Sequence, residues 1–103
     1  MSTGVEFEQG RLYVEPRKSV LFFARLGEAR LRCYVTLETL VEHFGARRDI
    51  ANAYKYCLRA YDRNDEVIQE IARQLILENE FAPDGAIVVG AATVAERGLA
   101  QAA

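Results

Sequence analysis

The sequence predicts an α+β fold, in which a mostly antiparallel sheet carries one short and one long helix on one face. Three observations support this fold class. Apolar and polar residues alternate in short segments of the first third of the chain, as in strands with one buried face. Apolar residues recur every three or four positions between Asp49 and Asn79, as on one side of a long helix. The segment Ala86–Val89 follows a Pro83-Asp84-Gly85 turn and supplies a short last strand.

The first alternating segments predict a β-hairpin. Val5 and Phe7 alternate with glutamates, and residues 11–14 are expected to return beside them after a loop at Gln9-Gly10. This register places the apolar residues of the two strands on one side of the hairpin: Val5, Phe7, Leu12 and Val14.

A second hairpin joins Ser19–Leu26 to Ala29–Val35. Gly27-Glu28 suits a type II′ turn, because glycine takes the first central position. The resulting register places three apolar pairs on one face: Ala24 with Leu31, Phe22 with Cys33, and Val20 with Val35. The opposite face carries the six residues that form the candidate binding surface: Leu21, Phe23, Arg25, Arg30, Arg32 and Tyr34.

This candidate surface is open to three interpretations. Arg25 lies directly opposite Arg30, an unfavourable pair that an anion or an acidic group of a partner would relieve. Phe23 beside Arg32 suits a cation–π contact. Uncovered apolar side chains are typical of a protein interface. Aromatic side chains beside arginines are typical of surfaces on which nucleic-acid bases stack. An antiparallel sheet also tolerates a face that is simply half hydrated. The net charge of −2 favours a partly hydrated face or self-association as a homodimer over nucleic acid, and another protein partner stays open.

The helices have recognisable ends. Thr36 is expected to cap the short helix at its start, and Gly45 to end it. One straight helix over 49–79 would span about 45 Å, whereas a compact domain of this size is about 34 Å across. The helix must therefore overhang the domain, bind a partner or break. A break is expected at Asp62-Arg63-Asn64-Asp65, where Asn64 would cap a second helix starting at Asp65. We favour one helix, with or without a kink.

Length and composition fit a single domain over residues 1–103, with its core at about 5–90. Residues 91–103 form an alanine-rich tail, expected either to fray or to make a weak helix around Thr93–Gly98. No signal peptide is visible in the sequence, and no apolar run approaches membrane-spanning length. These features predict a cytoplasmic protein with no membrane partner.

The sequence assembles no catalytic or metal-binding set. His43, the only histidine, has its nearest acid at Glu42, which points elsewhere on a helix. Cys33 and Cys57 fall on faces expected to be buried, and the acids at 62–66 lack the spacing of a calcium loop. We therefore expect no catalytic residues, metal or cofactor. A non-catalytic module that self-associates is the leading functional hypothesis, nucleic-acid or anion binding is the alternative, and an enzyme is the third.

A set of short motifs also resembles a known family. The motifs are Val5-x-Phe7, Val20-x-Phe22, Cys33-Tyr34-Val35, Leu40-Val41-Glu42-His43-Phe44, Ala72-Arg73-Gln74-Leu75-Ile76, and Phe81 through Gly85-Ala86-Ile87. In order and spacing they resemble the small bacterial proteins called domain of unknown function 1488. The resemblance implies an α+β domain with two hairpins, two helices and a final strand, in which Val20 and Phe22 face inward. It implies no activity, cofactor or substrate, and the tail after Thr93 extends beyond the usual end.

Overall fold

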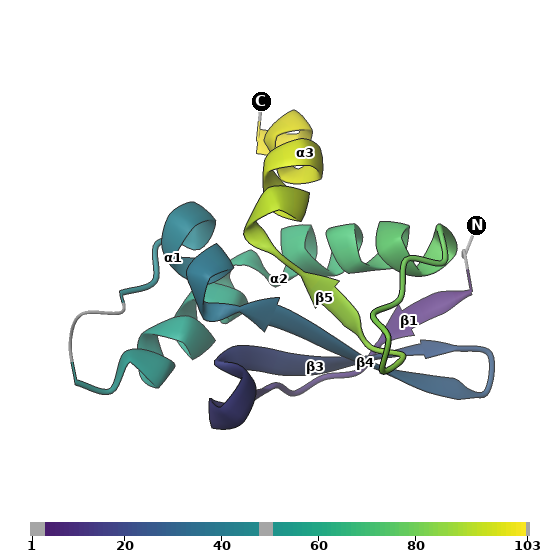
Figure 1. Ribbon diagram of the computed structural model, residues 1–103, viewed down its shortest axis with the longest axis horizontal. Helices are drawn as coiled ribbons and strands as arrows, with labels where there is room; N and C mark the ends of the chain where they lie inside the picture. Colours follow the sequence, from purple (N-terminus) through teal and green to yellow (C-terminus); the bar gives the residue numbers. More distant parts are fainter. Residues whose placement is uncertain (1–3, 48–50, 103) are drawn as a thin grey trace.

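The computed structural model describes residues 4–47 and 51–102. Within these ranges the α+β fold is confirmed, with a five-stranded sheet, a 3-10 turn η1 and three α-helices (Figure 1). In chain order the elements are β1 (Val5–Phe7), β2 (Leu12–Val14), η1 (Glu15–Arg17), β3 (Ser19–Leu26), β4 (Ala29–Thr36), α1 (Leu37–Phe44), α2 (Ala53–Leu77), β5 (Ile87–Val89) and α3 (Ala91–Ala102).

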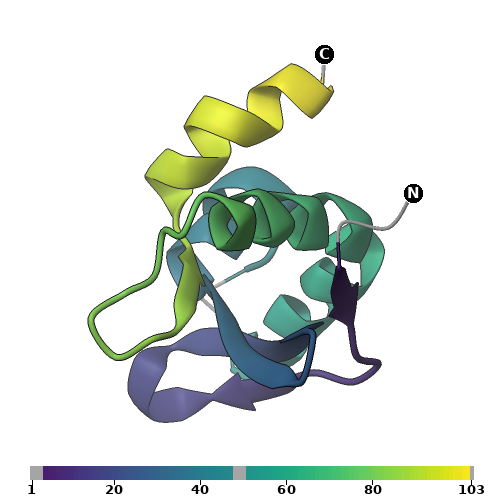
Figure 2. The same ribbon diagram turned by 90° about the vertical axis from the view of Figure 1, so that its right-hand side faces the viewer.

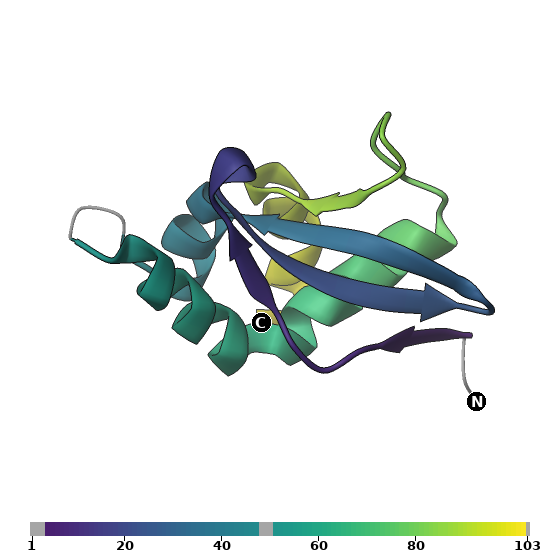
Figure 3. The same ribbon diagram turned by 90° about the horizontal axis from the view of Figure 1, so that it is seen from below.

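The sheet separates the helices from an open face. Its order is β1-β3-β4-β5, with β2 also paired to β3. All pairs are antiparallel except β4 with β5, which is parallel. The helices lie on one side in Figure 1, and the view from below in Figure 3 looks onto the other side of the sheet. We call the side turned away from the helices the outer sheet face.

The hairpin of β3 and β4 follows the predicted register in full. Phe22 pairs with Cys33, Val20 pairs with Val35, and the pairing continues to the ends of both strands. Gly27 has a φ of +61°, whereas Glu28 is not among the residues with positive φ, which is the combination that a type II′ turn requires.

The predicted hairpin of the first two strands is wrong. β1 and β2 do not pair with each other but follow one another along the same edge of β3, where Phe7 pairs with Ala24 and Leu12 pairs with Leu21 (Figure 3). The backbone N–H of Glu8 continues the edge by donating to the carbonyl oxygen of Phe23. The eight-residue β3 offers each short strand a longer partner than the other short strand would. Because Leu12 now lies opposite Leu21, it faces outward and does not share the side of Phe7.

The short helix begins and ends as predicted. The Thr36 hydroxyl accepts a hydrogen bond from the backbone N–H of Thr39, and Gly45 ends α1 with a φ of +80°.

The long helix is kinked at Asn64, within the predicted segment, where φ is −127° and ψ is 18°. The predicted chemistry of the kink is different. The Asn64 amide donates a hydrogen bond of 2.8 Å back to the carbonyl oxygen of Ala60, and among the described residues its side chain makes no hydrogen bond to the following turn. Asp49 and Ile50, at the predicted start of this helix, lie outside the described residues.

The core lies between the inner face of the sheet and the first two helices. Its fully buried side chains include Val20, Phe22, Cys33, Val35, Leu40, Ile68, Ile71 and Ile87. The last segment is a helix, α3, which crosses above α2 in Figure 2. Val94 of α3 is buried, and the Arg97 guanidinium binds the Glu78 carboxylate through two hydrogen bonds of 2.6 and 3.0 Å. This tertiary packing explains why a weakly predicted tail becomes helical.

Candidate binding surface

The outer sheet face has an apolar end and a charged end. Across the sheet, one row runs from Leu12 on β2 through Leu21 and Tyr34 to Val88 on β5. Near the β3–β4 turn, the corresponding row runs from Glu6 on β1 through Arg25 to Arg30. The structure therefore brings all six predicted surface residues to one face, and it adds three apolar residues that sequence reasoning missed: Leu12, Val14 and Val88.

The apolar row is more covered than the sequence suggested. Leu21 and Tyr34 are only 9% and 5% exposed, and both pack with the fully buried Ala86. Val14 and Phe23 are half-buried beside them. The expectation that these side chains have nothing above them is therefore wrong for the centre of the sheet. The apolar side chain that this face does expose is Leu12, which is 60% exposed and which the sequence placed on the side of Phe7.

Asp84 fastens the loop before β5 to the outer sheet face. Its carboxylate accepts hydrogen bonds from Arg17 at 2.8 Å and from the backbone N–H of Ala86 at 3.1 Å. Its carbonyl oxygen accepts another from Arg32 at 3.2 Å. The Arg17 guanidinium lies 3.9 Å from the centre of the Tyr34 ring and covers it. The bond from Arg17 is the main reason that the pKa of Asp84 is lowered.

The Glu8 carboxylate compensates the like charges of Arg25 and Arg30, which lie opposite each other on β3 and β4. Its carboxylate accepts two hydrogen bonds of 2.9 Å from Arg30, and it lies 3.8 Å from the Arg25 guanidinium. Arg30 also lies 3.7 Å from the centre of the Phe23 ring, so the cation–π partner of Phe23 is Arg30 and not the predicted Arg32. The bond from Arg30 lowers the pKa of Glu8. No external anion is needed to relieve the two arginines.

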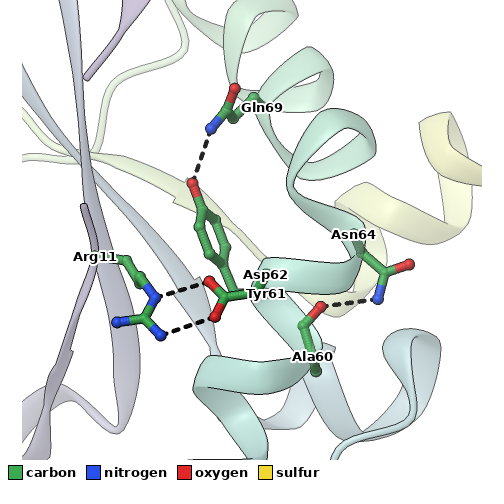
Figure 4. A network of polar contacts seen from close by, with 6 residues as sticks. All are labelled: Arg11, Ala60, Tyr61, Asp62, Asn64 and Gln69. Atoms are coloured by element: carbon green, nitrogen blue, oxygen red, sulfur yellow. Dashed lines mark hydrogen bonds and ion pairs between the residues drawn. The ribbon is translucent and has the colours of Figure 1, made fainter. Parts of the chain in front are cut away.

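A second polar network joins the edge of the sheet to the kink of α2 (Figure 4). Arg11 donates two hydrogen bonds of 2.7 and 2.8 Å to Asp62, and the Gln69 amide donates to the hydroxyl of buried Tyr61 at 3.0 Å. A cleft of about 400 Å³ lies between the β1–β2 connection and α2, beside these residues. Because Arg11 and Asp62 satisfy each other, this network mainly fixes the connection against the helix.

The residues with which the sequence analysis weighed catalysis and metal binding lie apart from one another or are buried. Neither range contains three or more histidine, cysteine or acidic side chains placed to hold a metal ion. Both cysteines are buried as free thiols, and burial raises the pKa of Cys33 to about 12. His43 packs near Phe44, with ring centres 6.4 Å apart. Among the helices in the described part of the chain, none is both long and apolar enough to cross a membrane.

Comparison with known proteins places this architecture in a family. A sequence profile described as Protein of unknown function (DUF1488) matches residues 5–89. The crystal structure of a DUF1488-family protein of unknown function from Shewanella loihica PV-4, solved at 1.60 Å, superposes with a TM-score of 0.75. The two are 24% identical, and the match covers 86% of this chain and 94% of the other. No protein with a curated function matches the chain. Because the profile spans most of the sequence and the folds agree, the chain belongs to the DUF1488 family.

Proposed function

We propose that this protein is a non-catalytic interaction module that forms a homodimer through the apolar end of its outer sheet face. The observation that supports it best is the 60% exposure of Leu12 at the edge of an apolar row. Burial of apolar surface is favourable by roughly 25 cal/mol per Å². Half-buried Val14 and Phe23 extend the same surface, so a partner placed on Leu12 would also cover them.

The charges of the outer sheet face favour a second copy of the chain as the occupant. Arg17 is paired with Asp84, and Arg30 is paired with Glu8, which Arg25 also approaches. Arg25 shares Glu8 with Arg30, and Arg32 binds only the carbonyl oxygen of Asp84, so this face keeps part of its positive charge but not a cluster of free cations for a phosphate backbone. A second copy would present the same apolar-centred surface, and a two-fold axis would bring the two apolar ends together.

The experiment measures molar mass by light scattering at tens of micromolar protein. Wild type is expected to be a dimer, and Leu12→Glu is expected to be a monomer that keeps the wild-type fold by circular dichroism. Leu77→Glu is the matched control, because Leu77 is 52% exposed at the end of α2, away from the outer sheet face. It should remain dimeric. Leu12 is a cleaner probe than Phe23, whose replacement would disturb the Arg30–Glu8 pair.

A monomeric wild type would overturn the homodimer, and a Leu12→Glu variant that stays dimeric would place the interface elsewhere. Titration with single-stranded nucleic acid at about 50 mM and about 200 mM salt tests the alternative. Binding through phosphates weakens steeply between these concentrations.

A further inference from the structure

A small cleft on the side of β2 opposite to Leu12 combines features that the homodimer does not use. It has a volume of about 290 Å³, close to the lower end of small-molecule sites, which are roughly 300–1,000 Å³. Its walls come from β2 and η1, the start of α1 and the start of α2, which meet at the left of Figure 1. The residues that line it include Tyr13, Glu15, Lys18, Leu37, Asn52 and Tyr54. We call this the Lys18 cleft.

Three polar side chains of the Lys18 cleft are unpaired within the described residues. These are the Lys18 ammonium, the Asn52 amide and the Tyr54 hydroxyl. The neighbouring Arg17 differs, because its guanidinium is bound to Asp84. The unpaired groups therefore remain available to a molecule that enters the cleft.

Two residues of the cleft have left-handed backbone conformations. Lys18 has φ 46° and ψ 54°, and Asn52 has φ 65° and ψ 35°. Asparagine tolerates this region, whereas a lysine gains nothing locally from it. Lys18 is held there from both sides, since its N–H donates to Glu15 and its carbonyl oxygen accepts from Leu37 at 2.8 Å. Backbone strain that the surrounding structure maintains is typical of functional sites.

The cleft also has an aromatic wall. The rings of Tyr13 and Tyr54 are 6.2 Å apart between centres and inclined by 43°. Tyr54 belongs to the apolar stripe predicted for the long helix, yet it is 43% exposed in this cleft. Half-buried Leu37 lines the same cleft. A flat aromatic ring would find aromatic and aliphatic contacts here.

We infer that the Lys18 cleft binds a small planar aromatic molecule carrying one anionic group, a carboxylate or a phosphate. The Lys18 ammonium binds the anion, Tyr13 and Tyr54 contact the ring, and the Asn52 amide donates to or accepts from polar atoms at its edge. The Glu15 carboxylate in the same cleft disfavours a polyanion such as nucleic acid. The volume limits the ligand to about two fused rings.

The test titrates the full chain with 2-naphthoate and with 2-naphthyl phosphate while recording amide ¹H–¹⁵N spectra. Saturable shifts are expected at Lys18, Leu37 and Tyr54 with at least one probe, and the tighter probe identifies the anionic group. Cyclohexanecarboxylate, which has the charge without the flat ring, should bind more weakly. If neither naphthyl compound shifts these residues saturably, the inference is overturned.

Matched variants assign the binding to the cleft. Lys18→Gln should weaken binding by about tenfold, which corresponds to about 1.4 kcal/mol. Lys55→Gln removes the only other lysine, one residue from Tyr54 but outside the cleft lining, and should bind like wild type. Equal affinities in the two variants would overturn the role of Lys18. If Lys18→Gln fails to fold, Lys18→Gly replaces it, because glycine accepts the left-handed conformation.

The test of ligand binding can be distinguished from the test of the homodimer. Leu12→Glu lies on the outer sheet face, outside the Lys18 cleft, so it should bind the probes as wild type does whatever its oligomeric state.

Discussion

At the scale of single residues, one carboxylate determines the character of the outer sheet face. Without Glu8, Arg25 and Arg30 would face each other unpaired and Arg30 would lose the contact that holds it above Phe23. Asp84 does the same for Arg17 above Tyr34. Glu8 lies in the irregular segment after β1, and Asp84 lies in the turn before β5. No periodic pattern in the sequence therefore indicates which residues their side chains contact.

Glu8 should contribute to the pH dependence of stability. Arg30 lowers its pKa below 4.5 in the folded protein, so the folded state favours the carboxylate. This contribution is present above the unfolded pKa and is lost as the pH falls through the folded value. The free energy of unfolding, measured with urea at about pH 7 and about pH 3, should therefore fall less in Glu8→Gln than in wild type.

The control for this experiment is Glu66→Gln, which removes an exposed carboxylate without a hydrogen bond or ion pair in the described part of the chain. It should keep the wild-type pH dependence. If Glu8→Gln also kept it, the Glu8–Arg30 pair would make no contribution in solution.

At the scale of secondary structure, the local sequence determines how a strand pairs only where the neighbouring strand is close in the chain, as for β3 and β4. In the β3–β4 turn there is space for a side chain at position 27, since a Cβ added to Gly27 would meet no atom within 4 Å. Its requirement for glycine is therefore conformational, arising from the φ of +61°.

Gly27→Val should lower the free energy of unfolding by about 1 kcal/mol or more, because a side chain with a Cβ is strained at this φ. Urea denaturation measures the change. Glu28→Ala alters the other central residue of the turn, which has no positive φ, and should stay within about 0.5 kcal/mol of wild type. A Gly27→Val variant as stable as Glu28→Ala would contradict the assignment of the turn.

At the scale of the whole molecule, the fold exposes two different surfaces. The molecule measures 40 × 31 × 25 Å, and the 25 residues of α2, about 38 Å long if straight, fit its longest dimension. The outer sheet face lies on the open side of the sheet, and the Lys18 cleft lies where β2, η1, α1 and α2 meet. If both proposals hold, a second copy of the chain on the outer sheet face would leave the Lys18 cleft open to a small ligand.

Self-association should couple to thermal stability, because dimer formation stabilises the folded state by mass action. The midpoint temperature of wild type is expected to rise when the protein concentration is raised about tenfold. The midpoint of Leu12→Glu is expected to stay constant. Calorimetry at two concentrations measures both, and a concentration-independent wild-type midpoint would argue against the dimer.

The sequence by itself determined the fold class, the complete register of β3 with β4, the limits of α1 and the place of the kink in α2. The register follows from a two-residue turn together with the alternation of apolar residues, and the limits of α1 follow from capping residues at its own ends. The tertiary structure alone decided that β1 and β2 share one edge of β3, since two short strands compete for partners along the whole chain. It also decided how the outer sheet face is covered. The Arg30–Glu8 and Arg17–Asp84 pairs join residues 22 and 67 positions apart, a separation over which side-chain chemistry carries no local signal. The Lys18 cleft is of the same kind, because its tyrosines and its lysine meet only when the first strands pack against the start of the long helix.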